Sequence, residues 1–122
     1  MTREAFLSFC AGLEGALLDR PFLDDPDTVV ARHERNRKWF AILMRAAGRE
    51  FVNLKCRPAE GSLLRGMFGG IRPAYHMNKE HWISVDLQGD VPREVIHRLV
   101  TDSHRLTAPR LRGRKSVQPA DK

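Results

Sequence analysis

The stretch KWFAILMRAAGREFVNLKC, residues 38–56, contains two apolar runs separated by a short segment around Gly48. The second run alternates, with Val52, Leu54 and Cys56 at every other position, which is the period of a strand with one buried face. Another apolar run begins just upstream at Thr28, and the connections between the three runs are too short for a crossover helix. The sequence therefore predicts an antiparallel meander of three strands, over residues 28–36, 38–45 and 49–56.

The segment before this meander has helical periodicity. Apolar residues recur every three or four positions from Phe6 to Leu17, and Thr2 is a suitable N-cap. Pro21 disfavours helical geometry in the residue before it, so this first helix is expected to end near Asp19 or Arg20. The acidic residues 24–27 around Pro26 are then expected to form a turn.

Two further helices and more extended chain are expected after the meander. One helix begins at Pro58 and ends at the pair Gly69–Gly70, and the last runs from Pro92 to the residue before Pro109. Residues 71–74 and 82–87 are expected to be extended. This order of elements predicts an α+β fold, in which the helices pack on one face of an antiparallel sheet.

Length and composition indicate one domain. A chain of 122 residues is long enough for one core and too short for two, and residues 108–122 hold too little apolar surface to fold. We expect a single domain over residues 1–107 and a basic, disordered tail over 108–122. No apolar run approaches the roughly 18 residues of a membrane span, and no signal peptide is recognisable, so a cytoplasmic protein is expected. Cys10 and Cys56 are expected to be buried, reduced thiols.

The net charge of +6 is unevenly distributed, because residues 28–57 hold eight basic and only two acidic side chains. A basic block on predicted strands can form a positive face that attracts phosphate, although a merely solvated face has the same composition. If the face binds DNA, with Lys79 and the tail assisting, its candidate contacts are Arg32, Arg35, Arg37, Lys38, Arg45 and Arg49.

The string Tyr75-His-Met-Asn-Lys-Glu-His-Trp82 gathers two imidazoles, an amide and an ammonium group. The spacing of its histidines does not suit a metal site, and no nucleophile motif such as GxSxG accompanies Ser84 or Cys56, so neither a metal nor a catalytic residue is expected. An anion site is a more suitable hypothesis. Its candidates are Lys55, Arg57, His76, Asn78, Lys79 and His81. The alternative is purely structural: aromatic packing and an asparagine turn.

This string, the upstream run Asn53-Leu-Lys-Cys-Arg-Pro58 and the later Asp102-Ser-His104 resemble the MmcQ/YjbR family of small bacterial proteins. The resemblance spans about residues 3–107. It implies a CyaY-like (frataxin-like) two-layer sandwich, also described as a double-wing DNA-binding arrangement. Gly61 and His104 depart from the family pattern, the latter where relatives more often have tyrosine. The acidic ridge of frataxins is not reproduced, so the resemblance does not bring iron with it.

Two classes of function therefore remain open, besides a ligand-free interaction module. The first is a non-enzymatic protein that binds the DNA backbone weakly and in a salt-dependent way. The second is a small-molecule or anion-binding domain, with or without catalytic activity, built around residues 75–82. Neither hypothesis requires a cofactor, and a monomer is expected.

Overall fold

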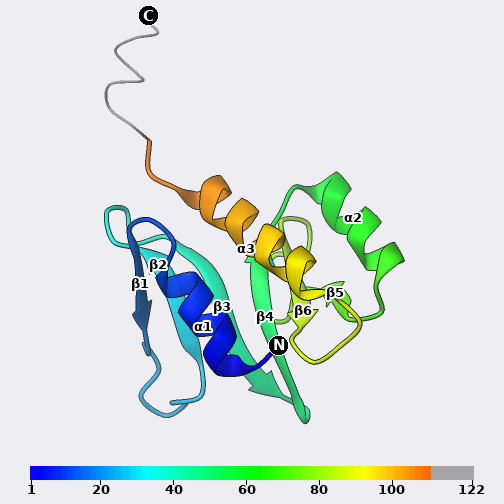
Figure 1. Ribbon diagram of the computed structural model, residues 1–122, viewed down its shortest axis with the longest axis horizontal. Coiled ribbons are helices and arrows are strands. Elements are labelled where there is room, and N and C mark those ends of the chain that lie inside the picture. Colours follow the sequence, from blue (N-terminus) through cyan, green and yellow to red (C-terminus); the bar gives the residue numbers. More distant parts are fainter. Residues whose placement is uncertain (111–122) are drawn as a thin grey trace, which may run out of the picture.

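The computed structural model describes residues 1–110, which form three helices and one six-stranded sheet (Figure 1). All neighbouring strands are antiparallel, in the order β1-β2-β3-β4-β6-β5. In chain order the elements are α1 (Arg3–Ala11), β1 (Ala16–Asp19), β2 (Val29–His33), β3 (Trp39–Ala46), β4 (Arg49–Lys55), α2 (Pro58–Met67), β5 (Ile71–Pro73), β6 (Trp82–Asp86) and α3 (Arg93–Thr107). The expected α+β class is confirmed. Most of the proposed tail, residues 111–122, lies outside the described residues.

The helices share one face of the sheet. In Figure 1, α1 and α3 lie across the strands, and α2 lies beside β5 and β6. The core between the layers contains Phe6 from α1, Leu64 from α2 and Leu99 from α3, together with Leu54 and Ile83 from the sheet. The helix layer predicted for one face is therefore observed.

The packing of the α2 helix explains why a glycine is tolerated at residue 61 inside a helix. Gly61 is buried, and a Cβ there would lie 2.9 Å from Cys56 Sγ and 3.4 Å from Ile83 Cγ2. The absence of a side chain therefore permits close packing of the helix on the sheet, which offsets the low helix propensity of glycine. Cys56 and Cys10 are free and buried as expected, and burial raises the pKa of the Cys10 thiol to about 12.

The first helix is shorter than its periodicity suggests, and the prediction of a helix to Asp19 or Arg20 is wrong. Thr2 does cap α1, since its Oγ1 accepts a hydrogen bond from Ala5 N at 3.1 Å, but the helix ends at Ala11. Residues 16–19 instead form β1, which pairs with Val30–His33. Leu17, counted in the helical stripe, is 39% exposed. Strand pairing satisfies the backbone here and overrides the local pattern.

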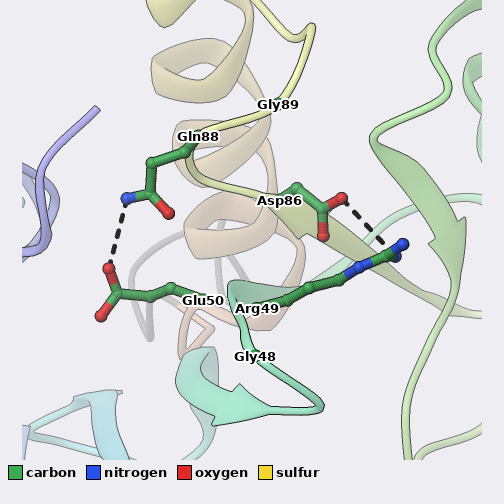
Figure 2. A pocket seen from close by; sticks show the side chains of 6 residues that line it. All are labelled: Gly48, Arg49, Glu50, Asp86, Gln88 and Gly89. Carbon is green, nitrogen blue, oxygen red and sulfur yellow. Dashed lines mark hydrogen bonds and ion pairs between the residues drawn. The ribbon is translucent and has the colours of Figure 1, made fainter.

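The Glu50 carboxylate joins both layers at the β3–β4 hairpin end of the sheet. It accepts hydrogen bonds from Arg3 of α1 at 2.8 Å, from Arg45 of β3 at 3.3 Å and from Gln88 at 3.3 Å, the last of which is visible in Figure 2. Burial alone would raise the pKa of Glu50, but the hydrogen bonds from Arg3 and Gln88 and the charges of Arg3 and Arg45 outweigh it and lower the pKa. Ionised Glu50 therefore stabilises the folded state.

We predict that Glu50→Gln lowers the free energy of unfolding at pH 7 by about 1–3 kcal/mol, because hydrogen bonds to a charged group are lost. The folded-state pKa is depressed, so the contribution of Glu50 is complete above the ordinary pKa of 4.5 and disappears as the pH falls through the lower folded value. The free energies of unfolding of parent and variant, measured by urea denaturation, should converge toward pH 3. The control Glu80→Gln, at a side chain 78% exposed, should change little. A pH-independent gap for Glu50→Gln would contradict this account.

Candidate functional site

One face of the sheet is not covered by the helices. Residues paired across an antiparallel sheet point to the same side, and the register aligns Val30, Ile42, Asn53, Ser84 and Arg72 across five strands. None of these five belongs to the hydrophobic cluster formed with the helices. We call this side the open face because no helix packs on it, although Val30, Ile42, Asn53 and Ser84 are each at most 4% exposed. Two connecting segments line a pocket on this face. One is the β1–β2 connection, which contains Phe22, and the other is the β5–β6 connection, which contains Tyr75, His76 and Met77.

A β-bulge turns Trp39 toward the open face. The pairing of β2 with β3 shifts between Ala31 and Arg32, so that Ala31 aligns with Ala41 but Arg32 aligns with Trp39. As a result Phe40 and Ala41 both belong to the core, and Trp39 lies on the other side, in edge contact with Phe22 at a ring-centroid distance of 6.1 Å. Bulges re-aim side chains in this way.

Two hydrogen bonds hold the backbone of Tyr75 on the open face, and a third joins the two side chains that form them. Asn53 Nδ2 donates to Tyr75 O at 2.9 Å, Tyr75 N donates to Ser84 Oγ at 3.0 Å, and Ser84 Oγ donates to Asn53 Oδ1 at 2.5 Å. Asn53 and Ser84 are paired in register and almost fully buried. The tyrosine ring is 39% exposed and packs edge-on against Phe51. A polar pair inside the sheet thus fixes the position of an exposed aromatic residue.

These features enclose a shallow pocket of about 190 Å³ on the open face. Ile42, Met44 and Asn53 come from the sheet, and the surrounding aromatic side chains come from both connecting segments and from β3. The pocket is lined by Phe22, Trp39, Ile42, Met44, Asn53, Tyr75, His76 and Met77. His76 has a left-handed backbone with φ of 61°, and its ring lies 3.9 Å from that of Tyr75. Non-glycine residues adopt this conformation only where the surroundings impose it.

The six predicted DNA contacts do not form one continuous face. Arg35, Arg37 and Lys38 lie in the exposed turn between β2 and β3, whereas Arg45 and Arg49 flank the β3–β4 turn at the opposite end of β3. Eight strand residues separate these ends by roughly 25 Å. Arg32 lies on the open face beside Trp39. The expectation of a single basic surface is therefore wrong, because the turns alternate between the two ends of the sheet.

The hairpin end is electrically neutralised. Arg45 lies 3.6 Å from Asp27 and 3.3 Å from Glu50, and Arg49 lies 4.0 Å from Asp86. Figure 2 shows Arg49 extended toward Asp86 beside the pair Glu50 and Gln88, around a hollow of about 280 Å³. Asp86 also pairs with Arg72 at 2.6 Å. The neighbouring carboxylates lower the local positive potential, which reduces the attraction of this end for a polyanion.

The opposite end gathers cations from four elements. The Ser103 hydroxyl of α3 donates to Phe40 O and accepts from Lys55 N, which brings the start of β3, the end of β4 and the C-terminal part of α3 together. Asn36 of the β2–β3 turn donates to Thr107 O. This basic end comprises Arg35, Arg37, Lys38, Lys55, Arg57, Arg105 and Arg110. Within residues 1–110, only Arg105 of this group is in an ion pair, with Asp102 at 3.3 Å.

Three of these arginines also border a hollow of about 360 Å³. Arg35, Arg105 and Arg110 line it together with His33 and His104, whose rings lie 4.5 Å apart. His33 is 2% exposed, and burial, followed by the charge of His104, lowers its pKa. The hollow is therefore lined by guanidinium groups and by imidazoles, of which His33 favours the neutral form.

The structure does not bring the six candidate residues of the anion hypothesis together at one site. Lys55, Arg57 and His81 come together where β4 ends and β6 begins, since Cys56 N donates to His81 O at 2.9 Å. His76 lines the open-face pocket instead. Asn78 acts as a turn former, because its Oδ1 accepts from Glu80 N at 2.8 Å and from His81 N at 3.1 Å. Lys79 is exposed in this turn.

Two side chains considered as nucleophiles have structural environments. Ser84 is fully buried and donates its hydroxyl hydrogen to Asn53. Cys56 is buried, and burial together with the charge of Glu60 raises the pKa of its thiol above the ordinary value, despite the opposing charge of Arg65. Within residues 1–110 no group of three or more histidine, cysteine or carboxylate side chains is arranged to hold a metal ion.

Sequence reasoning missed the roles of Asn53, Ser84 and Trp39. A signal existed for the first two, since each is a small polar residue inside an otherwise apolar strand, a position that requires a hydrogen-bonding partner. The orientation of Trp39 depends on a bulge, which leaves no mark in the alternation of β3. No helix among residues 1–110 is long and apolar enough to cross a bilayer.

Comparison with known proteins finds related chains over the whole described fold. A family model described as YjbR matches residues 11–106. The uncharacterized protein YyaQ of Bacillus subtilis is 32% identical, over 88% of this chain and 98% of its own length. A crystal structure from Pseudomonas syringae is 37% identical and superposes with a TM-score of 0.81, covering 88% of this chain and all of the other. The Deinococcus radiodurans protein DR2400, 29% identical, covers 93% of this chain and 85% of its own, with a TM-score of 0.80.

We predict that Asn53→Ala lowers the free energy of unfolding by about 2–3 kcal/mol, because Ser84 and the Tyr75 carbonyl lose a buried partner. A double-mutant cycle with Ser84→Ala, measured by urea unfolding, should be strongly non-additive, since both residues belong to one network. Additive losses would mean that the two side chains act independently and do not jointly hold Tyr75.

Proposed function

The chain belongs to the YjbR family, and from this premise we propose that it is a DNA-binding module that contacts the phosphate backbone through the basic end of its sheet. The proposal retains Arg35, Arg37 and Lys38 from the contacts expected from sequence and adds Lys55 and Arg57. It makes no use of Arg45 and Arg49.

The observation that carries the proposal is the difference between the two ends of the sheet. At the hairpin end, Arg3, Arg45, Arg49 and Arg72 each have a carboxylate partner. At the basic end, among residues 1–110, Arg35, Arg37, Lys38, Lys55 and Arg57 have none within ion-pair distance. Unpaired cations can each neutralise a phosphate and release a counterion, which is the main source of sequence-independent affinity for DNA.

The chain continues from this end into more positive charge. Arg110 follows the end of α3, and the remaining sequence adds Arg112, Arg114 and Lys115. These residues add to the positive charge of the chain that follows α3.

Binding of a small anion is the second candidate. The hollow lined by Arg35, Arg105 and Arg110 favours it, because three guanidinium groups border one space. Inorganic phosphate distinguishes the two candidates. It should bind on its own and raise the unfolding temperature if the hollow is a small-anion site, whereas a backbone-binding surface should respond to phosphate only as to any salt.

We predict that the double variant Arg35→Gln, Lys38→Gln binds DNA more weakly and with a smaller salt dependence. The slope of log K against log salt should become less steep by about 1.8, because two phosphate contacts are removed. The measurement is fluorescence anisotropy of a labelled duplex at several salt concentrations.

The matched control is Arg45→Gln, Arg49→Gln, which removes the same net charge from the paired end. It should leave the slope nearly unchanged. Equal loss in both double variants would mean a diffuse charge effect without a defined surface, and no binding of the parent at low salt would refute the proposal.

A further inference from the structure

We infer that the open-face pocket takes an unstacked base, so that the preferred ligand is single-stranded DNA. This inference rests on the proposed function and deepens it, because it names the form of nucleic acid. It arises from a different set of residues, the aromatic side chains around the pocket, and from their position next to the basic end.

The pocket has the chemistry of a stacking platform. Trp39, Phe22 and Tyr75 come from three separate segments and all border the same hollow. Phe22 and Tyr75 are 42% and 39% exposed, which is high for large aromatic side chains whose segments are otherwise held in place. Aromatic rings offered to solvent at the surface of a sheet stack on bases of any sequence, because every base has a π-face.

The aromatic rings are held ready for a ligand. The bulge in β3 directs Trp39 outward, and Phe22 supports it edge-on. Asn53 and Ser84 bind both backbone polar groups of Tyr75. A platform that is rigid before binding loses little conformational entropy when a base stacks on it.

Cations lie next to this platform on the side toward the basic end. Lys38, which has no carboxylate partner among residues 1–110, precedes Trp39 in the chain, whereas Arg32, aligned with Trp39 on the neighbouring strand, is paired with Asp19 at 3.5 Å. Lys55 lies two positions beyond Asn53 on β4, so its side chain leaves the same face. A strand whose base enters the pocket would therefore have its phosphates close to positive charge, as in other single-strand binders.

The size and openness of the site favour a single strand over a duplex. A pocket of about 190 Å³ is smaller than the roughly 300 Å³ at which drug-sized ligand sites begin, and it admits one planar ring system. In a duplex the faces of the bases are stacked on one another and unavailable, whereas bases of a single strand can turn outward onto aromatic side chains.

The test compares a 12-nucleotide oligo(dT) with a duplex of equal length at the same salt concentration, by fluorescence anisotropy. We expect the parent to bind the single strand more tightly than the duplex. Trp39→Leu and Tyr75→Leu should each weaken single-strand binding about tenfold and leave duplex binding nearly unchanged, because stacking and not charge is removed.

Conservative variants and a remote control sharpen the comparison. Trp39→Phe and Tyr75→Phe retain a ring and should retain most of the affinity, whereas Leu63→Ala, at an exposed apolar residue of α2, should have no effect. Circular dichroism and unfolding midpoints establish that each variant folds. If Trp39→Leu does not fold, the pair Tyr75→Leu and Tyr75→Phe carries the test, since the Tyr75 side chain makes none of the anchoring hydrogen bonds.

The outcomes separate this inference from the proposed function. Salt-dependent duplex binding without preference for the single strand, or leucine variants that bind oligo(dT) like the parent, would overturn the stacking site alone. Equal weakening of both ligands by the leucine variants would also overturn it, because the rings would then act only through the fold. Absence of binding to either ligand would overturn both proposals.

Discussion

The buried hydrogen bonds between Asn53, Ser84 and Tyr75 determine what the open face of the sheet can do. Two polar side chains in the centre of a sheet would be costly without partners, and here they satisfy each other and the backbone of the segment that crosses them. The middle of the face is covered, since Ile42 and Asn53 are at most 4% exposed, and the accessible part is the pocket bordered by Phe22, Trp39 and Tyr75. These buried hydrogen bonds thus hold the backbone of Tyr75 in place, so that its side chain lines the same pocket as Trp39.

The two ends of the strands differ in charge. At the hairpin end, arginines connect α1 and β3 to Glu50, and β4 and β5 to Asp86. At the other end, cations from the β2–β3 turn and the ends of β4 and α3 remain in solvent. The net charge of +6 therefore does not describe the uneven distribution of charge, because the unpaired positive side chains are concentrated next to the aromatic pocket.

Most of the fold could be predicted from the sequence, because strand alternation, Pro58 and the glycine pair at residues 69–70 report local structure. The first helix was overestimated, since Leu17 continues the helical stripe by chance while its backbone pairs with β2. The candidate site was harder to predict from the sequence than the fold. The basic residues can be read from the sequence, but which of them meet a carboxylate depends on packing between distant segments, and the outward turn of Trp39 depends on a bulge that periodicity cannot reveal.

The most direct test of this account is an amide chemical-shift titration of isotope-labelled protein with oligo(dT). We expect the largest changes in residues 32–39, 53–57 and 75–82, where the basic end and the aromatic pocket adjoin. Changes centred on residues 45–50 and 86–90, at the neutralised end, or spread evenly over α1 and α2, would contradict it.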